Sequence, residues 1–163
     1  MNFLPDPLHP AIVHFPIALA MVAFLFEVIS RHRRLAGLAP AGSLLVVLAA
    51  LGALAAYVTG RLAADEAVVP PDAAGILDTH EDLGIAVMVG LVMLALVRLA
   101  LARGGRSSGV AAWLYIGAFA VVVALVVRTG HLGGQMVFRH GVGTAPVERL
   151  LSQQPSPTTP SGG

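Results

Sequence analysis

Four long apolar runs divide this 163-residue chain, and they limit its fold more than any other feature. A helix needs about 20 residues to cross a hydrocarbon core of about 30 Å, and each run approaches that length. Charged residues form only 12% of the sequence, against about a quarter in soluble domains. We therefore predict an all-α, polytopic membrane protein whose transmembrane helices lie at approximately Ile12–Ile29, Gly42–Tyr57, Leu83–Leu101 and Val110–Val127.

The connections between these runs are short enough to make successive helices antiparallel neighbours, which predicts an up-down-up-down four-helix bundle. Small residues four positions apart let transmembrane helices approach closely. Gly52, Ala56 and Gly60 have this spacing in the second run, and Ala120 and Ala124 have it in the fourth. We expect both stripes to face neighbouring helices.

Outside the four apolar runs, the sequence predicts one membrane domain and one polar tail. We predict a transmembrane domain over residues 1–151 and a disordered tail over residues 152–163, because Ser, Thr, Pro, Gln and Gly dominate the latter. The longest connection, Arg61–Thr79, is expected to be an outer loop. After the fourth helix, Gly133 and Gly134 are expected to punctuate a short separate segment.

The distribution of arginine predicts the orientation, because cationic loops stay in the cytoplasm. The first loop holds three arginines between residues 31 and 34, and the third holds Arg103 and Arg106. The middle loop has Arg61 among several acidic residues. Both ends of the chain and the middle loop are therefore predicted to face the outside.

The residue inventory excludes several functions. The chain has no Cys, which removes disulfides, iron–sulfur clusters and thiolate metal sites. Its net charge is +1, and all ten cationic side chains are Arg, so no basic footprint for nucleic acid is present. An enzymatic role is less expected than binding or electron transfer, because no hydrolytic triad or metalloprotease motif is found.

Histidines gather on the predicted outer side, and an internal repeat relates two of them. The first half of the chain runs from His14 to Thr59-Gly60, and the second runs from His80 to Thr129-Gly130. Both halves have the same orientation, so an axis along the membrane normal would relate them. His14 and His80 are then counterparts, whereas His32, among the loop arginines, is expected to be solvated.

This repeat favours a haem site. In a four-helix bundle the first and third helices lie on a diagonal, and their imidazoles can meet at one central metal. We predict that His14 and His80 are the axial ligands of a haem b, and His131 is a further candidate. Arg128 is expected to hold a haem propionate or to snorkel to the membrane interface. Asp78 and Glu81 are expected to form a capping box that places His80 in the first turn of its helix.

Two other functions stay open. A divalent metal ion, in a binding or transport protein, would use His14, His80, His131 and Glu81, since imidazole and carboxylate suit several metals. His9 and His140 are weaker ligand candidates, and His9 is expected to cap the first helix. The third alternative is a non-catalytic membrane subunit whose histidines stabilise the outer loops.

Residues near the inner ends of the helices carry a separate expectation. Glu27 and Arg98 lie on the diagonal pair of helices and are expected to form a structural ion pair or to snorkel, with a proton path as the alternative. Trp113 and Tyr115 are expected in an inner aromatic belt.

Four motifs resemble those of a known family. They are His9-Pro10-Ala11-Ile12-Val13-His14-Phe15-Pro16, Thr59-Gly60, His80-Glu81 and Thr129-Gly130-His131-Leu132-Gly133-Gly134-Gln135. In this order they resemble DUF2231, a bacterial family of four-helix membrane proteins, over nearly the whole chain apart from the tail.

The resemblance implies a multi-pass protein of the bacterial inner membrane, with both termini on the periplasmic side as the arginines predict. Similar domains occur joined to Rieske iron–sulfur domains, which implies electron transfer on the outer face. This chain has no Rieske part because it has no Cys. Its expected partners are therefore the lipid bilayer and a quinol or a periplasmic redox protein.

Overall fold

The computed structural model describes residues 8–103, 109–144 and 150, and the described part of the chain is helical without a β-strand. The predicted all-α fold is confirmed. The 152–163 tail lies outside the described residues. The elements, in chain order, are α1 (His9–Ile12), α2 (His14–Ile29), the 3-10 helix η1 (Arg33–Leu38), α3 (Ala39–Glu66), α4 (Ala74–Arg103) and α5 (Val110–His140).

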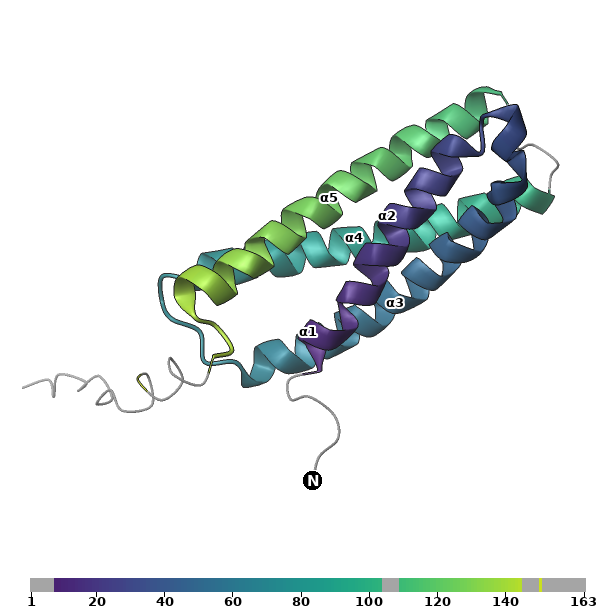
Figure 1. Cartoon of the computed structure of the whole chain (residues 1–163). Coiled ribbons are helices and arrows are strands. Elements are labelled where there is room, and N and C mark those ends of the chain that lie inside the picture. Colours follow the sequence, from purple (N-terminus) through teal and green to yellow (C-terminus); the bar gives the residue numbers. More distant parts are fainter. Residues whose placement is uncertain (1–7, 104–108, 145–149, 151–163) are drawn as a thin grey trace, which may run out of the picture.

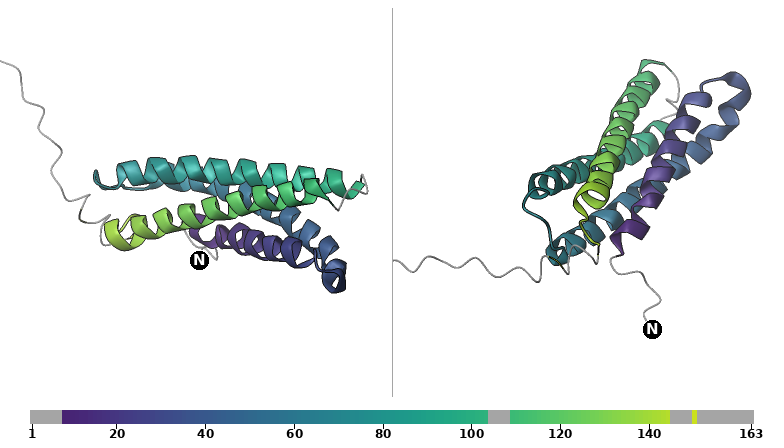
Figure 2. Two further views of the ribbon diagram at one scale, coloured as in Figure 1. Left: turned by 90° about the horizontal axis from the view of Figure 1, so that it is seen from above. Right: turned by 60° about the vertical axis from the view of Figure 1, so that its left-hand side comes forward.

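Four helical segments are long and apolar enough to cross a membrane, and α1 with α2 together make the first of them. The segments alternate in direction, and α2 packs on α3, α3 on α4, α4 on α5, and α5 back on α2 (Figure 1). Figure 2 shows the α2–α3 and α4–α5 hairpins as the two halves of this bundle. The predicted up-down-up-down bundle is confirmed, with α2 and α4 on a diagonal.

The first crossing is interrupted at Val13, between α1 and α2. Pro10 lies in the first turn of α1, where its missing N–H has no cost. Pro16 cannot donate a hydrogen bond to the carbonyl of Ile12, which explains the break. Pro16 packs closely against Gly52 of α3, because a methyl group at Gly52 would lie 3.2 Å from the Pro16 Cδ.

Only one of the two predicted small-residue stripes packs as expected. Gly52 contacts α2, Gly60 contacts α1, and Ala56 between them is buried. The prediction for α5 is wrong, because Ala120 and Ala124 are exposed. The buried face of α5 instead carries larger residues, including Phe119, Val122 and Val126. Gly90 of α4 makes room for Val122, whose Cγ2 would lie 2.8 Å from a methyl group at that glycine.

At the end opposite η1, the helices extend further than predicted. Helix α3 continues to Glu66 and α4 begins at Ala74, so the connection covers only residues 67–73. The predicted capping box is wrong, because α4 begins one turn before Asp78. Helix α5 continues through its glycines to His140, where Gly141 adopts φ 65° and its N–H binds the Val137 carbonyl at 3.1 Å. Hydropathy marks only the membrane-buried part of each helix, which explains these differences.

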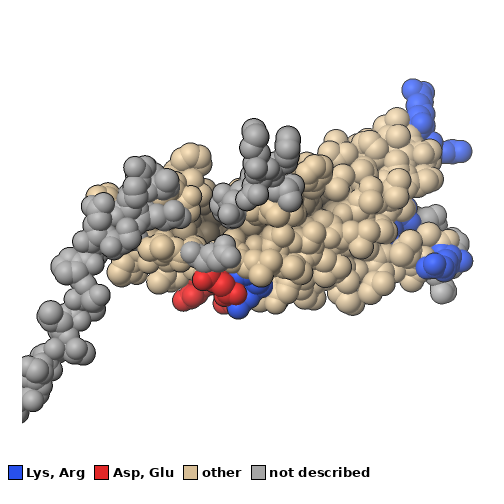
Figure 3. Space-filling view, turned by 90° about the horizontal axis from the view of Figure 1, so that it is seen from below, with Lys and Arg blue, Asp and Glu red and all other residues tan. Residues whose placement is uncertain are grey.

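Charge separates the two ends of the bundle. Arginines gather at the end that carries η1, and a wide surface without charged side chains extends from there (Figure 3). His9 and His140 lie at the opposite end, together with the 67–73 connection (Figure 1). His32 is exposed at the Arg-rich end, as predicted. Trp113 is exposed near that end, but the belt position predicted for Tyr115 is wrong because Tyr115 is buried in the core.

Candidate functional site

A cavity of about 260 Å³ lies between the helices at the end opposite η1. All four crossings contribute to its wall, and much of that wall is small or apolar. Helix α3 provides Ala53, Ala56 and Gly60, and deeper in the bundle Pro16 and Leu91 close the cavity. Small side chains on α3 therefore leave room for a ligand where larger ones would fill the bundle.

His9 lines this cavity from α1 and is half-buried. Its Nδ1 lies 3.4 Å from the hydroxyl oxygen of Thr59, which itself donates to the Ala55 carbonyl at 2.9 Å. With the Thr59 proton directed to that carbonyl, the tautomer of His9 that carries its hydrogen on Nδ1 would satisfy both groups. Gly60 allows this approach, since a methyl group there would lie 3.0 Å from the His9 Cε1.

His80 lines the same cavity from α4, and its ring is held in the same way. Its Nδ1 lies 3.0 Å from the backbone carbonyl of Thr129 on α5. A carbonyl only accepts, so Nδ1 must carry the hydrogen. Gly133 lies against the ring, since a methyl group at that glycine would lie 3.3 Å from the His80 Cε1. In the neutral tautomer that donates from Nδ1, each histidine leaves Nε2 as the nitrogen that can bind a metal.

The two histidines occupy equivalent places in the two halves of the molecule. His9 and Thr59 are 50 residues apart, and His80 and Thr129 are 49 apart. His14 lies five residues closer to Thr59 and does not fit this spacing. The counterpart of His80 is therefore His9, and the repeat predicted from sequence needs this correction.

His14 is exposed, does not line the cavity, and places its Nδ1 2.5 Å from the Pro10 carbonyl. The predicted meeting of His14 with His80 is thus not formed. Five residues of helix turn a side chain by about 140°, so His9 and His14 face different sides of the first crossing.

The α5 candidates also lie outside the cavity lining. His131 is exposed, with its Nε2 2.8 Å from the side-chain nitrogen of Gln135. Arg128 is exposed as well. His140 lies 3.0 Å from a carboxylate oxygen of Asp72, which ties the end of α5 to the 67–73 connection. The unbroken α5 helix explains these positions, because it keeps Arg128 and His131 on its outer face.

Glu81 does line the cavity, but it pairs with a cation that sequence reasoning did not select. Arg61 of α3, another lining residue, donates to Glu81 at 3.0 Å. Arg61 directly follows the Thr-Gly pair, and this position is the signal that could have identified it.

No three His or carboxylate side chains converge within residues 8–103 and 109–144. The ion site predicted from His14, His80, His131 and Glu81 is therefore not assembled. The physical reason is the face on which each residue lies, since only His80 and Glu81 of the four line the cavity.

Comparison with known families agrees with this architecture. Residues 5–146 match the profile of the family described as "Predicted membrane protein (DUF2231)", which covers most of the chain. The chain belongs to the DUF2231 family. No curated protein and no solved structure matches it.

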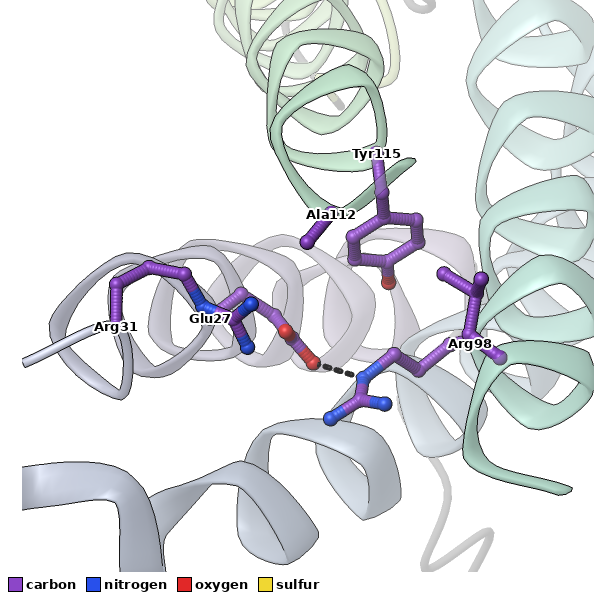
Figure 4. A pocket seen from close by; sticks show the side chains of 6 residues that line it. Glu27, Arg31, Arg98, Ala112 and Tyr115 are labelled. Carbon is purple, nitrogen blue, oxygen red and sulfur yellow. Dashed lines mark hydrogen bonds and ion pairs between the residues drawn. The ribbon is translucent and has the colours of Figure 1, made fainter. Parts of the chain in front are cut away.

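Of the arrangements left open for Glu27 and Arg98, the ion pair is the one that this DUF2231 protein forms, near the Arg-rich end of the bundle. Arg98 Nε lies 2.5 Å from Glu27 Oε1, and both side chains are buried (Figure 4). Arg98 also donates to the Ala39 carbonyl at 3.3 Å. The buried core between this pair and the cavity lined by His9 and His80 is apolar, including Ala20 and Phe119. The pair therefore connects α2, α3 and α4 away from that cavity.

Proposed function

We propose that this DUF2231 protein binds one haem b in the outer cavity, with His9 and His80 as axial ligands, and acts in electron transfer. The observation that carries this proposal is the matched setting of the two imidazoles. Each places Nδ1 within hydrogen-bond distance of an oxygen on the neighbouring helix, which would fix the ring and leave Nε2 as the metal-binding nitrogen. Histidines that bind metals typically donate their other N–H to such a partner.

The lining of the cavity suits a flat, largely apolar cofactor. Ala53, Ala56 and Gly60 give the α3 side of the cavity small side chains. Gly60 also lies against the His9 ring, and Gly133, outside the lining, lies against the His80 ring. The wall continues inward to apolar residues such as Leu91. Haem would supply one-electron redox chemistry, and the chain would exclude water from it and orient its ligands.

Arg61 would hold an acidic substituent of the cofactor at the outer rim. It lines the cavity, and its guanidinium already binds the Glu81 carboxylate at 3.0 Å. A propionate offers the same carboxylate chemistry. Arg128, the residue selected from sequence for this role, is exposed and does not line the cavity.

The position of the cavity limits what a single haem here can do. It lies near one end of the bundle, so a haem there cannot carry an electron across the whole membrane. We propose that the Arg-rich end faces the cytoplasm of a bacterial inner membrane, with both termini in the periplasm. A quinol or a periplasmic redox protein would then exchange electrons at the outer end.

The direct test is a dithionite-reduced minus oxidised absorption spectrum of protein purified in detergent after expression with ample haem. Sharp reduced-haem bands in the native protein, absent from His80→Ala, are expected. The control is His131→Ala, which leaves the cavity lining intact and should keep the bands. A featureless spectrum from folded native protein would overturn the proposal and favour the non-catalytic membrane subunit.

A further inference from the structure

A second, much smaller cavity lies at the inner end of the bundle, beside the Glu27–Arg98 ion pair. Its volume is about 10 Å³, and its lining includes Tyr115 and Ala112 of α5 as well as both partners of the ion pair (Figure 4). This volume is close to what one water molecule needs. The cavity is separate from the proposed haem site, because the apolar core lies between them.

The hydroxyl group of Tyr115 gives this cavity a polar group that lacks a partner within the described part of the chain. Tyr115 is only 5% exposed, and its hydroxyl has no hydrogen-bond partner among the described residues. Leaving such a group unpaired typically costs about 1–3 kcal/mol. In Figure 4 the hydroxyl points toward the gap beside Glu27 and Arg98. An unpaired hydroxyl directed into a water-sized space indicates a ligand there.

The other side of the cavity offers the polar partners that a buried water requires. Arg98 binds Glu27 Oε1 through its Nε, and a carboxylate can accept several hydrogen bonds at its two oxygens. A buried ion pair is stable only when its remaining hydrogen-bonding groups are also satisfied. A water held between Tyr115 and the ion pair would have the two or more polar partners that buried waters have.

We propose that this inner cavity is a binding site for a single water molecule that bridges the Tyr115 hydroxyl to the Glu27–Arg98 pair. The water links α5 to the polar contact between α2, α3 and α4. The ligand class follows from size and chemistry, since the cavity admits a small protic molecule and its wall offers both donors and acceptors.

Radiolytic footprinting tests the site, because hydroxyl radicals formed from a bound water oxidise side chains beside it even when those side chains are buried. Native protein is irradiated in detergent and the modified residues are identified by mass spectrometry. Tyr115 should be oxidised, whereas Phe119 should stay at background. Phe119 is the matched control because it packs on Tyr115, with ring centroids 5.9 Å apart, is fully buried and does not line the cavity.

Two cavity-filling variants, Ala112→Val and Leu101→Phe, separate a bound water from leakage of bulk solvent. Each replaces a lining residue with a larger one and leaves Tyr115 in place. A variant counts as folded when it keeps the native circular dichroism spectrum and elution volume. Loss of Tyr115 oxidation in a folded variant supports the water site. Background oxidation of Tyr115 in the native protein would overturn it, and so would unchanged oxidation in a folded, cavity-filled variant.

Discussion

At the residue scale, the first-helix ligand that we propose, His9, lies five positions before His14, the residue that the sequence favoured. His14 lies inside the apolar run, and its place at the membrane boundary favoured it. His9 lies where the leader is expected to end, so the sequence makes it a weaker ligand candidate that more readily caps a helix. The spacing from each histidine to its Thr-Gly pair favours His9, with separations of 50 and 49 residues in the two halves. The position of His80 beside the cavity was foreseeable, because both the repeat and the outer side selected it.

The buried ion pair gives a prediction at this scale. Removing one partner, as in Arg98→Ala, leaves a buried carboxylate uncompensated and should lower the free energy of unfolding by about 3–5 kcal/mol. The matched control is Arg61→Ala, which breaks the exposed pair with Glu81 and should cost about 0–1 kcal/mol. Denaturant titration in mixed micelles measures both values. Equal losses for the two variants would contradict the burial argument.

At the element scale, hydrophobicity predicted four crossings but not where the helices end. Apolar runs mark the part of a helix that contacts lipid, and α3 and α5 continue beyond that part with polar residues. The glycines after the fourth run were interpreted as breaks. In the structure Gly133 instead lies against His80 within α5. Gly133 is needed there because the His80 ring approaches the α5 backbone closely, not because the backbone bends. The sequence shows a glycine in either case, so it does not distinguish a close contact from a break.

The glycine of α3 that faces His9 gives the second prediction. A methyl group at Gly60 would lie 3.0 Å from the His9 ring, so Gly60→Ala should displace the imidazole and weaken haem binding. Gly84→Ala is the control, because Gly84 also lines the cavity but a methyl group there meets nothing within 4 Å. Haem titration followed by absorbance compares the two dissociation constants. Weaker binding in Gly84→Ala than in Gly60→Ala would contradict the proposed role of Gly60.

At the scale of the whole molecule, the two polar sites share one symmetry. Glu27 and Arg98 are 71 residues apart, and the same interval separates His9 from His80. Both pairs therefore occupy equivalent positions of the two hairpins, one pair near each end of the bundle, and of these only Glu27 and Arg98 are in contact. A pseudo-twofold axis along the membrane normal would run between the members of each pair. A cofactor held between two symmetry-related axial ligands would lie on this axis.

The orientation in the membrane is the prediction at this scale. The chain has no Cys, so single cysteines report accessibility without background. Pro71→Cys, in the 67–73 connection, should react with a membrane-impermeant maleimide in spheroplasts. Gly37→Cys, in η1 at the Arg-rich end, should react only after permeabilisation, because cationic loops stay in the cytoplasm. The reverse pattern would invert the proposed topology.

The central claim is that His9, and not His14, forms the haem site together with His80. The most direct measurement compares reduced minus oxidised spectra of His9→Ala and His14→Ala, purified in parallel with the native protein. We expect the haem bands to be lost in His9→Ala and retained in His14→Ala, because only His9 lines the cavity. Bands that persist without His9 and disappear without His14 would contradict the account.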